Sequence, residues 1–235
     1  MSTTETLFRD DAYLAECEAT VIDTTDGAVI LDRTVFYPMG GGQPGDTGTL
    51  SWDGGSAQVI DTRYGDRGAI RHILADNAEA PPEGANITAA IDWDRRYRHM
   101  RMHTALHLLG VVLKYGVTGG NISAERSRLD FDMQDGVDRD DVNDQLRALV
   151  EANHAVTCRW ITDAELAANP DLVRTMSVQP PKGAGKVRLL DIDGVDLQPC
   201  GGTHLKSTGE VGKVQVCKVE KKGARNRRVY IELDS

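Results

Sequence analysis

Two short motifs that lie far apart in the chain constrain its fold more than any other feature. Each carries two metal-binding side chains four positions apart, His103 and His107 in HTALH and Cys200 and His204 in CGGTH. Imidazole and thiolate groups both suit zinc, and these four side chains together would fill a tetrahedral zinc shell. If one ion joins the two motifs, the chain between them must fold back so that its ends meet.

A histidine pair on an apolar helix is by itself a weak sign of a metal. The double glycine of CGGTH strengthens it, because a tight turn there would bring Cys200 and His204 together. A zinc-protease helix needs a glutamate beside its first histidine, and position 104 is threonine, so peptide hydrolysis is disfavoured. Four protein ligands would also close the shell, as in structural zinc sites. Catalysis would then need a fifth ligand or a loosely held residue, and we expect Cys200 or His204 to be held more loosely than the helical pair.

The first part of the chain has the pattern of a small all-β domain. Runs rich in Val, Ile and Thr alternate with Gly, Asp-Gly and Pro-Pro turns. The predicted strands are residues 17–23, 28–32, 57–63, 69–74 and 86–92. Such spacing predicts a closed or nearly closed β-barrel. The glycine-rich run at 40–48 within it fits either a flexible loop or a place of close backbone approach.

The remainder of the chain alternates helical and strand patterns. A helix capped by Asp92 or Asp94 should run to about Tyr115 and end at Gly116 and the glycines at 119–120, with His103 and His107 on one face. Strands are predicted at 127–132, 155–161, 187–192, 213–219 and 228–233, and helices at 137–153 and after a capping box at 162–165. We therefore predict an α+β fold: a small N-terminal β-barrel domain (1–93), then an α+β domain (94–235) with a mostly antiparallel sheet and a zinc-ligand helix.

Charge and composition limit the classes of partner. The formal net charge of −9 argues against indiscriminate nucleic-acid binding, although it permits a local basic face. Basic residues gather in two clusters, which favour a surface that follows a nucleic-acid backbone, with a solvated basic hairpin as the alternative. The clusters are Arg95, Arg96, Arg98 and Arg101, and Lys213, Lys218, Lys221, Lys222, Arg225, Arg227 and Arg228. No run has the length of a membrane span and the first residues lack a signal pattern, which predicts a cytoplasmic protein without a membrane partner.

In these motifs the chain resembles the free-standing alanyl-tRNA editing proteins of the AlaX type, which are related to the editing domain of alanyl-tRNA synthetase. The resemblance spans nearly the whole chain. It rests on HTALHLL at 103–109, RLDFD at 128–132, CGGTH at 200–204 and TGEVG at 208–212. FYPMGGGQPGDTG at 36–48 resembles the glycine-rich motif of the longer members, with Gly40, Gly41, Gly42 and Asp46 as its matching residues.

This resemblance implies a trans-acting hydrolase that cleaves the ester between a wrong amino acid, chiefly serine, and the terminal adenosine of alanine tRNA. It also implies Zn²⁺ held by His103, His107, Cys200 and His204, where the ion could activate a water or hold the substrate. Editing must spare alanine, so polar groups should recognise the serine hydroxyl. The candidates for this recognition are Gln43, Asn121, Ser123 and Thr104. The glycine-rich loop would form a lid over the metal. The candidates for a general base are His99 and Glu125.

Two alternatives stay open, and the sequence leaves the oligomeric state unknown. The closed ligand set also suits a non-catalytic tRNA-binding module with a structural zinc. Threonyl-tRNA synthetases carry a related domain, so the chain could instead edit another aminoacyl-tRNA.

Overall fold

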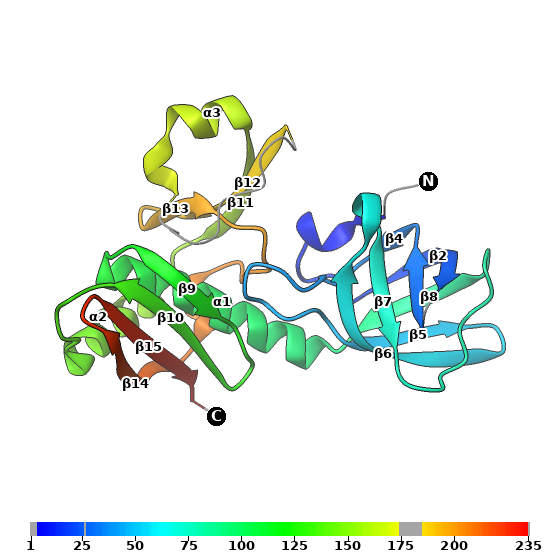
Figure 1. Cartoon of the computed structure of the whole chain (residues 1–235), viewed down its shortest axis with the longest axis horizontal. Coiled ribbons are helices and arrows are strands. Elements are labelled where there is room, and N and C mark those ends of the chain that lie inside the picture. Colours follow the sequence, from blue (N-terminus) through cyan, green and yellow to red (C-terminus); the bar gives the residue numbers. More distant parts are fainter. Residues whose placement is uncertain (1–3, 26, 174–184, 235) are drawn as a thin grey trace. The chain divides into compact units, whose positions relative to one another are not determined.

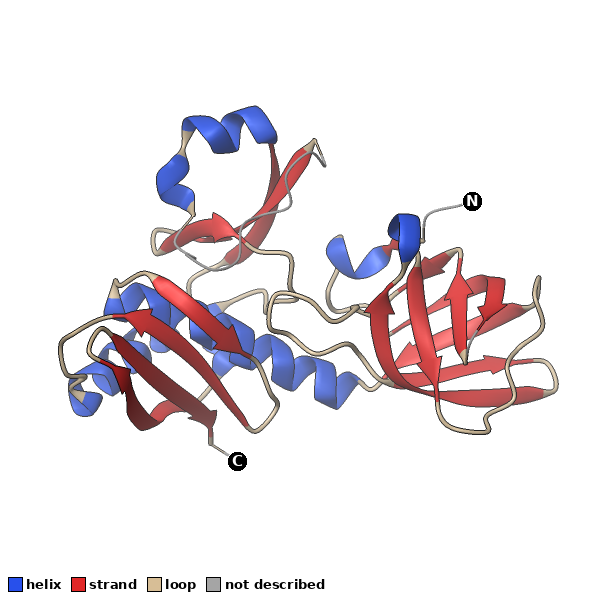
Figure 2. Cartoon of the chain, viewed as in Figure 1, coloured by secondary structure: helices blue, strands red, loops and turns tan. Residues whose placement is uncertain are grey.

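The computed structural model describes residues 4–25, 27–173 and 185–234. They form two compact units, divided between Arg98 and His99. Most of the ordered structure is strand, with a few helices (Figures 1 and 2). Nearly all strand pairs are antiparallel, which confirms the predicted α+β class. No helix in the described part of the chain is both long enough and apolar enough to cross a membrane.

A closed β-barrel forms most of the first unit, as predicted. Its strand order is β2-β3-β7-β6-β5-β8, and every neighbouring pair is antiparallel. The strands are β2 (Glu16–Thr25), β3 (Ala28–Leu31), β5 (Gly48–Trp52), β6 (Gly55–Tyr64), β7 (Ile70–Leu74) and β8 (Asn86–Ile91). Alternate residues such as Val21, Leu50 and Val59 fill the interior. The sequence pattern missed β5, whose first residue closes the glycine-rich run.

Shorter elements border the barrel. Strands β1 (Glu5–Thr6) and β4 (Arg33–Thr34) pair in parallel. Two single-turn 3₁₀ helices, η1 (Leu7–Arg9) and η2 (Asp66–Gly68), complete the described elements of this unit.

The glycine-rich motif forms a tight turn on a fixed base. Gly40 N–H donates to the Gln43 carbonyl (3.1 Å), and Gln43 N–H donates back to the Gly40 carbonyl (2.9 Å). Gly41 and Gly42 between them have φ of +58° and +84°, the left-handed values that a two-residue hairpin turn requires. At Gly45 a Cβ would lie 2.1 Å from the Thr62 carbonyl oxygen, so only glycine fits against β6. Of the two interpretations of the glycine-rich run, close backbone approach therefore applies at Gly45, where the run packs against β6.

A buried ion pair between Asp46 and Arg96 anchors the motif within the first unit. Their side chains are 1% and 0% exposed, and Arg96 Nε donates to Asp46 Oδ2 over 2.9 Å. The same carboxylate oxygen accepts from Tyr37 N–H, while Arg96 also donates to the carbonyls of Ala12 and Val35. The guanidinium of Arg96 is therefore used inside the fold, and its predicted contact with tRNA stays a prediction.

Helix α1 (Trp93–Leu113) begins where the sequence predicted, with Asp92 Oδ1 accepting from Arg95 N–H as a helix cap. It ends at Leu113, and Lys114 takes the left-handed conformation (φ +57°) that usually favours glycine. The predicted end at about Tyr115 is two residues too late, and Gly119 and Gly120 lie in strand β9 (Val117–Asn121) instead of ending the helix. Because α1 continues across the division between the units, independent folding of 1–93 and 94–235 as domains stays a prediction.

The second unit contains two antiparallel sheets. The larger has the order β14-β15-β10-β9 and the smaller the order β11-β12-β13. Their strands are β9 (Val117–Asn121), β10 (Arg126–Asp132), β14 (Val214–Gly223), β15 (Asn226–Leu233), β11 (Val156–Thr162), β12 (Lys186–Ile192) and β13 (Asp196–Pro199). The sequence pattern predicts these strands except β9 and β13.

Short helices accompany both sheets. Helix α2 (Arg139–Glu151) packs against β14 and the 3₁₀ helix η4 (Thr208–Val211) through Val142, Leu146 and Val150, which share one helical face. Helix α3 (Asp163–Ala168) begins with the predicted capping box, in which Thr162 and Glu165 satisfy each other's backbone N–H groups. The 3₁₀ helix η3 (Pro170–Leu172) follows it.

Replacing Arg96 by Ala should lower the free energy of unfolding by about 3–5 kcal/mol, because Asp46 would be left as an uncompensated buried charge. Denaturant titration of the whole chain, followed by circular dichroism, measures this loss. Arg63→Ala serves as the control, since Arg63 is 62% exposed and its pairing with Asp61 should contribute at most about 1 kcal/mol. A loss no larger than that of the control would contradict the anchoring role.

Candidate metal centre

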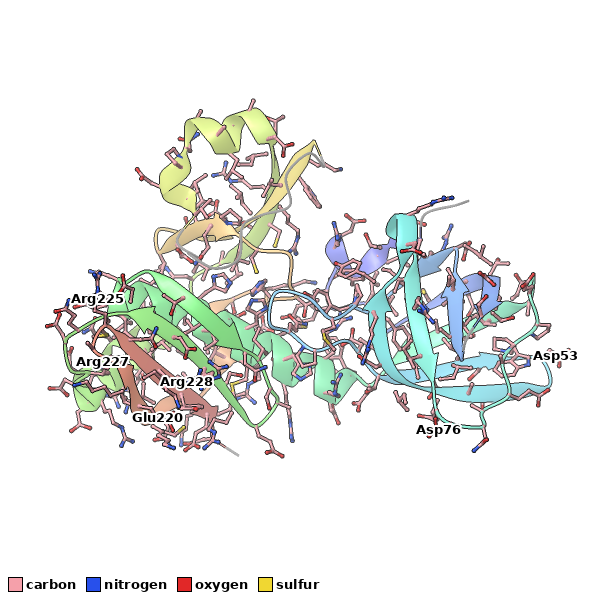
Figure 3. All side chains as sticks on the ribbon, in the orientation of Figure 1. Asp53, Asp76, Glu220, Arg225, Arg227 and Arg228 are labelled. Atoms are coloured by element: carbon pink, nitrogen blue, oxygen red, sulfur yellow. The ribbon has the colours of Figure 1, made fainter. Side chains whose placement is uncertain are left out.

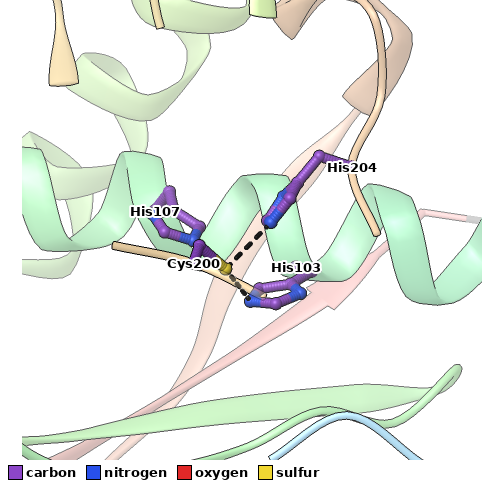
Figure 4. A group of neighbouring side chains, drawn as sticks. All are labelled: His103, His107, Cys200 and His204. Atoms are coloured by element: carbon purple, nitrogen blue, oxygen red, sulfur yellow. Dashed lines mark hydrogen bonds between the residues drawn. The ribbon is translucent and has the colours of Figure 1, made fainter. Parts of the chain in front are cut away.

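Four potential metal ligands converge within the second unit (Figure 4). His103 and His107 project from α1, and Cys200 and His204 come from the loop that follows β13. The ligand atoms of the four side chains all lie within 4.8 Å of one another. The ring centroids of His103 and His204 are 4.2 Å apart, and those of His103 and His107 are 5.3 Å apart. The two motifs therefore meet at one place in the fold.

The distances from the Cys200 sulfur to two of the imidazoles are close to those around a single tetrahedral ion. Around zinc, with bonds of about 2.3 Å to sulfur and about 2.0 Å to nitrogen, a sulfur and a nitrogen ligand lie about 3.5 Å apart. Cys200 Sγ lies 3.5 Å from His103 Nε2 and 3.1 Å from His204 Nε2. One thiolate and three imidazoles also make a donor set that suits zinc.

The turn that carries Cys200 is firmly held. Arg188 on β12 donates through Nη1 to the carbonyls of Cys200 (3.1 Å) and Gly202 (2.9 Å), and its own carbonyl accepts from Cys200 N–H. Arg188 is itself buried. A buried arginine thus fastens the backbone on both sides of Gly201, and looser metal binding by Cys200 stays a prediction.

The outer nitrogens of two rings have their own partners. His204 Nδ1 lies 3.4 Å from Thr104 Oγ1, which also accepts from Leu205 N–H (3.3 Å). His107 Nδ1 lies 3.4 Å from Asp196 Oδ2 and 2.9 Å from Gln198 Nε2. Each ring is thus oriented through Nδ1, which leaves Nε2 to face the cluster.

Electrostatics within the cluster favour the metal-binding protonation states of Cys200 and His204. Burial alone would raise the pKa of the Cys200 thiol, but His103 and His204 hold it well below its usual range, which favours the thiolate that binds metals. Burial, followed by the charge of His103, lowers the pKa of His204 to about 3, so this ring is neutral at pH 7. For His107, burial is outweighed by hydrogen bonds to Asp196 and Cys200, which raise its pKa to about 9. A proton held by His107 must therefore leave when a metal binds.

The residues predicted to recognise the serine hydroxyl have different surroundings. Thr104 is fully buried and its hydroxyl is used by His204 and Leu205. Ser123 shares a turn with Ser127, whose hydroxyl accepts from Ser123 N–H and donates to the Ser123 carbonyl. Asn121 is exposed at the end of β9. Gln43 is buried and belongs to the first unit. Substrate recognition by any of the four stays a prediction.

The two predicted general bases also differ in exposure. His99 lies one turn before His103 on α1 and is only 2% exposed. Glu125 is exposed in the connection between β9 and β10. Neither assignment as a base is tested by this geometry.

Many of the basic residues on β14 and β15 are paired with carboxylates. Figure 3 labels Arg225, Arg227, Arg228 and Glu220 on this hairpin, in which Glu220 pairs with Arg228 across the two strands. Arg228 donates to both oxygens of Asp130 (2.7 and 2.9 Å), Arg225 reaches Asp132 (3.3 Å), and Glu220 accepts from Lys218 and Lys222. Lys213 and Lys221 are exposed. The cluster is therefore much less positive than its basic residues alone suggest.

Arg227 is buried, and its guanidinium donates to the backbone carbonyls of Gly223, Gln134 and Asn226. These bonds tie the hairpin together, and a contact of Arg227 with tRNA stays a prediction.

In the first cluster, Arg95 donates to the Gly45 carbonyl and Arg101 to the Val211 carbonyl, while Arg98 is exposed. A tRNA-binding role for these three residues stays a prediction.

Asp196, Gln198 and Arg188 are not among the site residues predicted from the sequence. The first two carry a signal, since residues 196, 198 and 200 alternate with the period of a strand and therefore share one face. Arg188 lies in a predicted strand, and nothing in its local sequence points to the carbonyls that it binds.

Two sequence-family models match parts of the chain. The model described as tRNA synthetases class II (A) matches residues 4–95, and the one described as Threonyl and Alanyl tRNA synthetase second additional domain matches residues 187–230. The second match includes Cys200 and His204 of the candidate centre.

Full-length relatives define the family. The chain is 37% identical to the alanyl-tRNA editing protein AlaX-M of Methanosarcina mazei, covering 98% of this chain and 96% of that protein. It is 34% identical to the AlaX-M protein of Saccharolobus solfataricus, covering 97% and 98%. It is also 37% identical to the alanine–tRNA ligase of Halobacterium salinarum over 93% of this chain but only 25% of the ligase. With such identity along both AlaX-M proteins, the chain belongs to the AlaX family of alanyl-tRNA editing proteins.

Proposed function

We propose that this chain is a trans-acting hydrolase that removes a wrong amino acid, chiefly serine, from alanine tRNA at a zinc-containing site. One observation carries the proposal: the two motifs shared with the editing family supply four side chains whose ligand atoms lie within 4.8 Å of one another. The names of the full-length relatives, alanyl-tRNA editing proteins, support the reaction class. Zinc is the metal that best suits three imidazoles and one thiolate.

The reaction adds water across the ester that joins the amino acid to the tRNA. The amino acid leaves with a carboxyl group, and the terminal adenosine recovers its hydroxyl. A zinc ion at this site supplies a positive charge that polarises the ester carbonyl or lowers the pKa of a water. Thr104 would orient His204, and Arg188 would hold Cys200 in place.

The contacts of Arg188 and Thr104 affect how a zinc site with four protein ligands could take part in catalysis. Displacement of Cys200 would disturb a turn that Arg188 fixes at the Cys200 and Gly202 carbonyls. Displacement of His204 would disturb its contact with Thr104. A fifth coordination position, which catalytic zinc sites can gain, therefore fits this fold better than the loss of either ligand.

Selectivity for serine over alanine requires a polar group that is left unpaired when the substrate lacks a hydroxyl. Thr104 and Ser123 already have hydrogen-bond partners within the fold. Asn121, which is exposed on β9, is the stronger candidate in the second unit, with Gln43 as the candidate from the first.

Exposed cations would provide the contacts with the tRNA backbone. Arg98, Lys213 and Lys221 are exposed, whereas several neighbouring basic residues pair with carboxylates. Few cations on an acidic protein would give modest, salt-sensitive binding to tRNA in general. Selection of alanine tRNA would then depend on more than charge.

The set of four ligands itself favours a second candidate, a non-catalytic tRNA-binding module with a structural zinc. A third, an editor of another aminoacyl-tRNA, is motivated by the family model that covers both threonyl and alanyl synthetases.

A deacylation assay separates these functions. The purified protein should release serine from seryl-tRNA(Ala) and leave alanyl-tRNA(Ala) largely intact, and a chelator should abolish the release. His103→Ala should be folded and bind tRNA but be inactive, while Cys217→Ser, outside the cluster, should keep its activity. Equal release of both amino acids, or of neither, would contradict the proposal. General unfolding of His103→Ala would instead favour the structural zinc.

Cobalt provides a direct optical test of the cluster, because a thiolate bound to Co²⁺ gives a charge-transfer band in the near ultraviolet. Titration with Co²⁺ should develop this band and saturate at one ion per chain. Cys200→Ser should lose the band, whereas Cys217→Ser should retain it. A band that persists in Cys200→Ser would mean that another cysteine binds the ion.

A further inference from the structure

We infer that Asp196 and Gln198 form a supporting pair that positions His107 as a metal ligand through Nε2. In this pair Asp196 accepts a hydrogen bond from the Nδ1–H of His107. This inference rests on metal binding at the proposed site and is independent of the hydrolase reaction. Both residues lie on β13, two and four positions before Cys200. Strand alternation therefore places them on the same face and directs them toward the helix that carries His107.

The two side chains and the ring form a close triangle. Gln198 Nε2 lies 2.5 Å from Asp196 Oδ2, and His107 Nδ1 lies 3.4 Å from the same oxygen. The two nitrogens, Gln198 Nε2 and His107 Nδ1, are 2.9 Å apart. Asp196 and Gln198 are 5% and 9% exposed, so the triangle is largely shielded from water.

Hydrogen-bond chemistry decides how the triangle is protonated when a metal is present. A neutral imidazole carries one proton, so a ring that binds a metal through Nε2 must carry it on Nδ1 and donate it. Of its two neighbours only Asp196 Oδ2 is an acceptor, because Gln198 presents its amide nitrogen. Gln198 Nε2 and His107 Nδ1, which are 2.9 Å apart, are then both donors to the same oxygen, Asp196 Oδ2.

The orientation of the Gln198 amide follows from the shortest of these contacts. Reversing the amide would place its oxygen 2.5 Å from Asp196 Oδ2, so that two acceptors would face each other. Gln198 therefore donates to the carboxylate and holds it beside the ring. Asp196 binds the ring directly, and Gln198 acts on His107 through Asp196.

A carboxylate in this position does more than fix the ring plane. Its negative charge makes the imidazole a better donor to the metal, and losing such a partner typically weakens metal affinity by about 10–100-fold. The charge also needs compensation, since an isolated buried carboxylate is unfavourable, and an imidazole bound to a cation provides it. His204 differs, because its Nδ1 faces the neutral hydroxyl of Thr104. The two sides of the cluster are thus supported unequally.

Zinc affinity, measured by competition with a chromophoric chelator, tests the inference without an activity assay. Asp196→Asn keeps the shape of the side chain and removes its charge, and it should bind zinc about 10–100-fold more weakly than the unmodified protein. Asp193→Asn is the matched control, because Asp193 is exposed in the turn between β12 and β13. The zinc affinity of this control should stay within about twofold of that of the unmodified protein, which is a smaller change than the loss of a ligand's partner causes. Equal affinities of Asp196→Asn and the unmodified protein would overturn the inference while leaving the metal site intact. Failure of the unmodified protein to bind zinc would instead overturn the proposed metal site, and the inference with it.

A second measurement needs no variant at Asp196 and covers the case in which that variant fails to fold. A long-range ¹H–¹⁵N correlation spectrum of the zinc-loaded protein should show His107 protonated at Nδ1 and metal-bound at Nε2. Coordination through Nδ1 would overturn the inference.

Discussion

The convergence of the Cys200 sulfur with the imidazoles of His103, His107 and His204 is the constraint on which the second unit depends. It requires α1 to present two histidines on one face and the chain after β13 to return to that face. The elements around it supply the restraints that this demands: Arg188 fixes the CGGTH turn, Thr104 fixes His204, and Asp196 lies beside His107. A metal ion at this point would join parts of the chain that are distant in sequence, and its contribution to folding would follow from that.

The first unit depends on a different buried charge. Asp46 belongs to the glycine-rich motif and Arg96 to the first turn of α1, and their ion pair is almost completely shielded from solvent. Such a pair is costly to break from one side, which favours a single arrangement of the motif. The tight turn at Gly41 and Gly42 is therefore built on a rigid base. We see the glycine-rich motif as a preformed surface of the first unit.

Where structure follows local periodicity or capping, the sequence predicts it well: five of the six barrel strands, the start of α1 and the capping box of α3 all match. The end of α1 and strand β9 were mispredicted because residues there adopt backbone conformations that their type usually disfavours. Lys114 ends α1 in a conformation expected of glycine, and Gly119 lies within a strand. The metal ligands could be proposed from spacing and donor chemistry, but Arg188 could not, since it reaches its partners only through tertiary contacts. The basic clusters were overestimated because sequence does not reveal that Arg228 pairs with Asp130.

X-ray absorption spectroscopy of the zinc-loaded protein tests most directly that the two motifs form one metal centre. We predict a first shell of three nitrogen scatterers at about 2.0 Å and one sulfur scatterer at about 2.3 Å. The imidazole signals should fall by one nitrogen in His107→Ala, and the sulfur signal should vanish in Cys200→Ser. A shell without sulfur, or one with more than a single sulfur, would contradict the account.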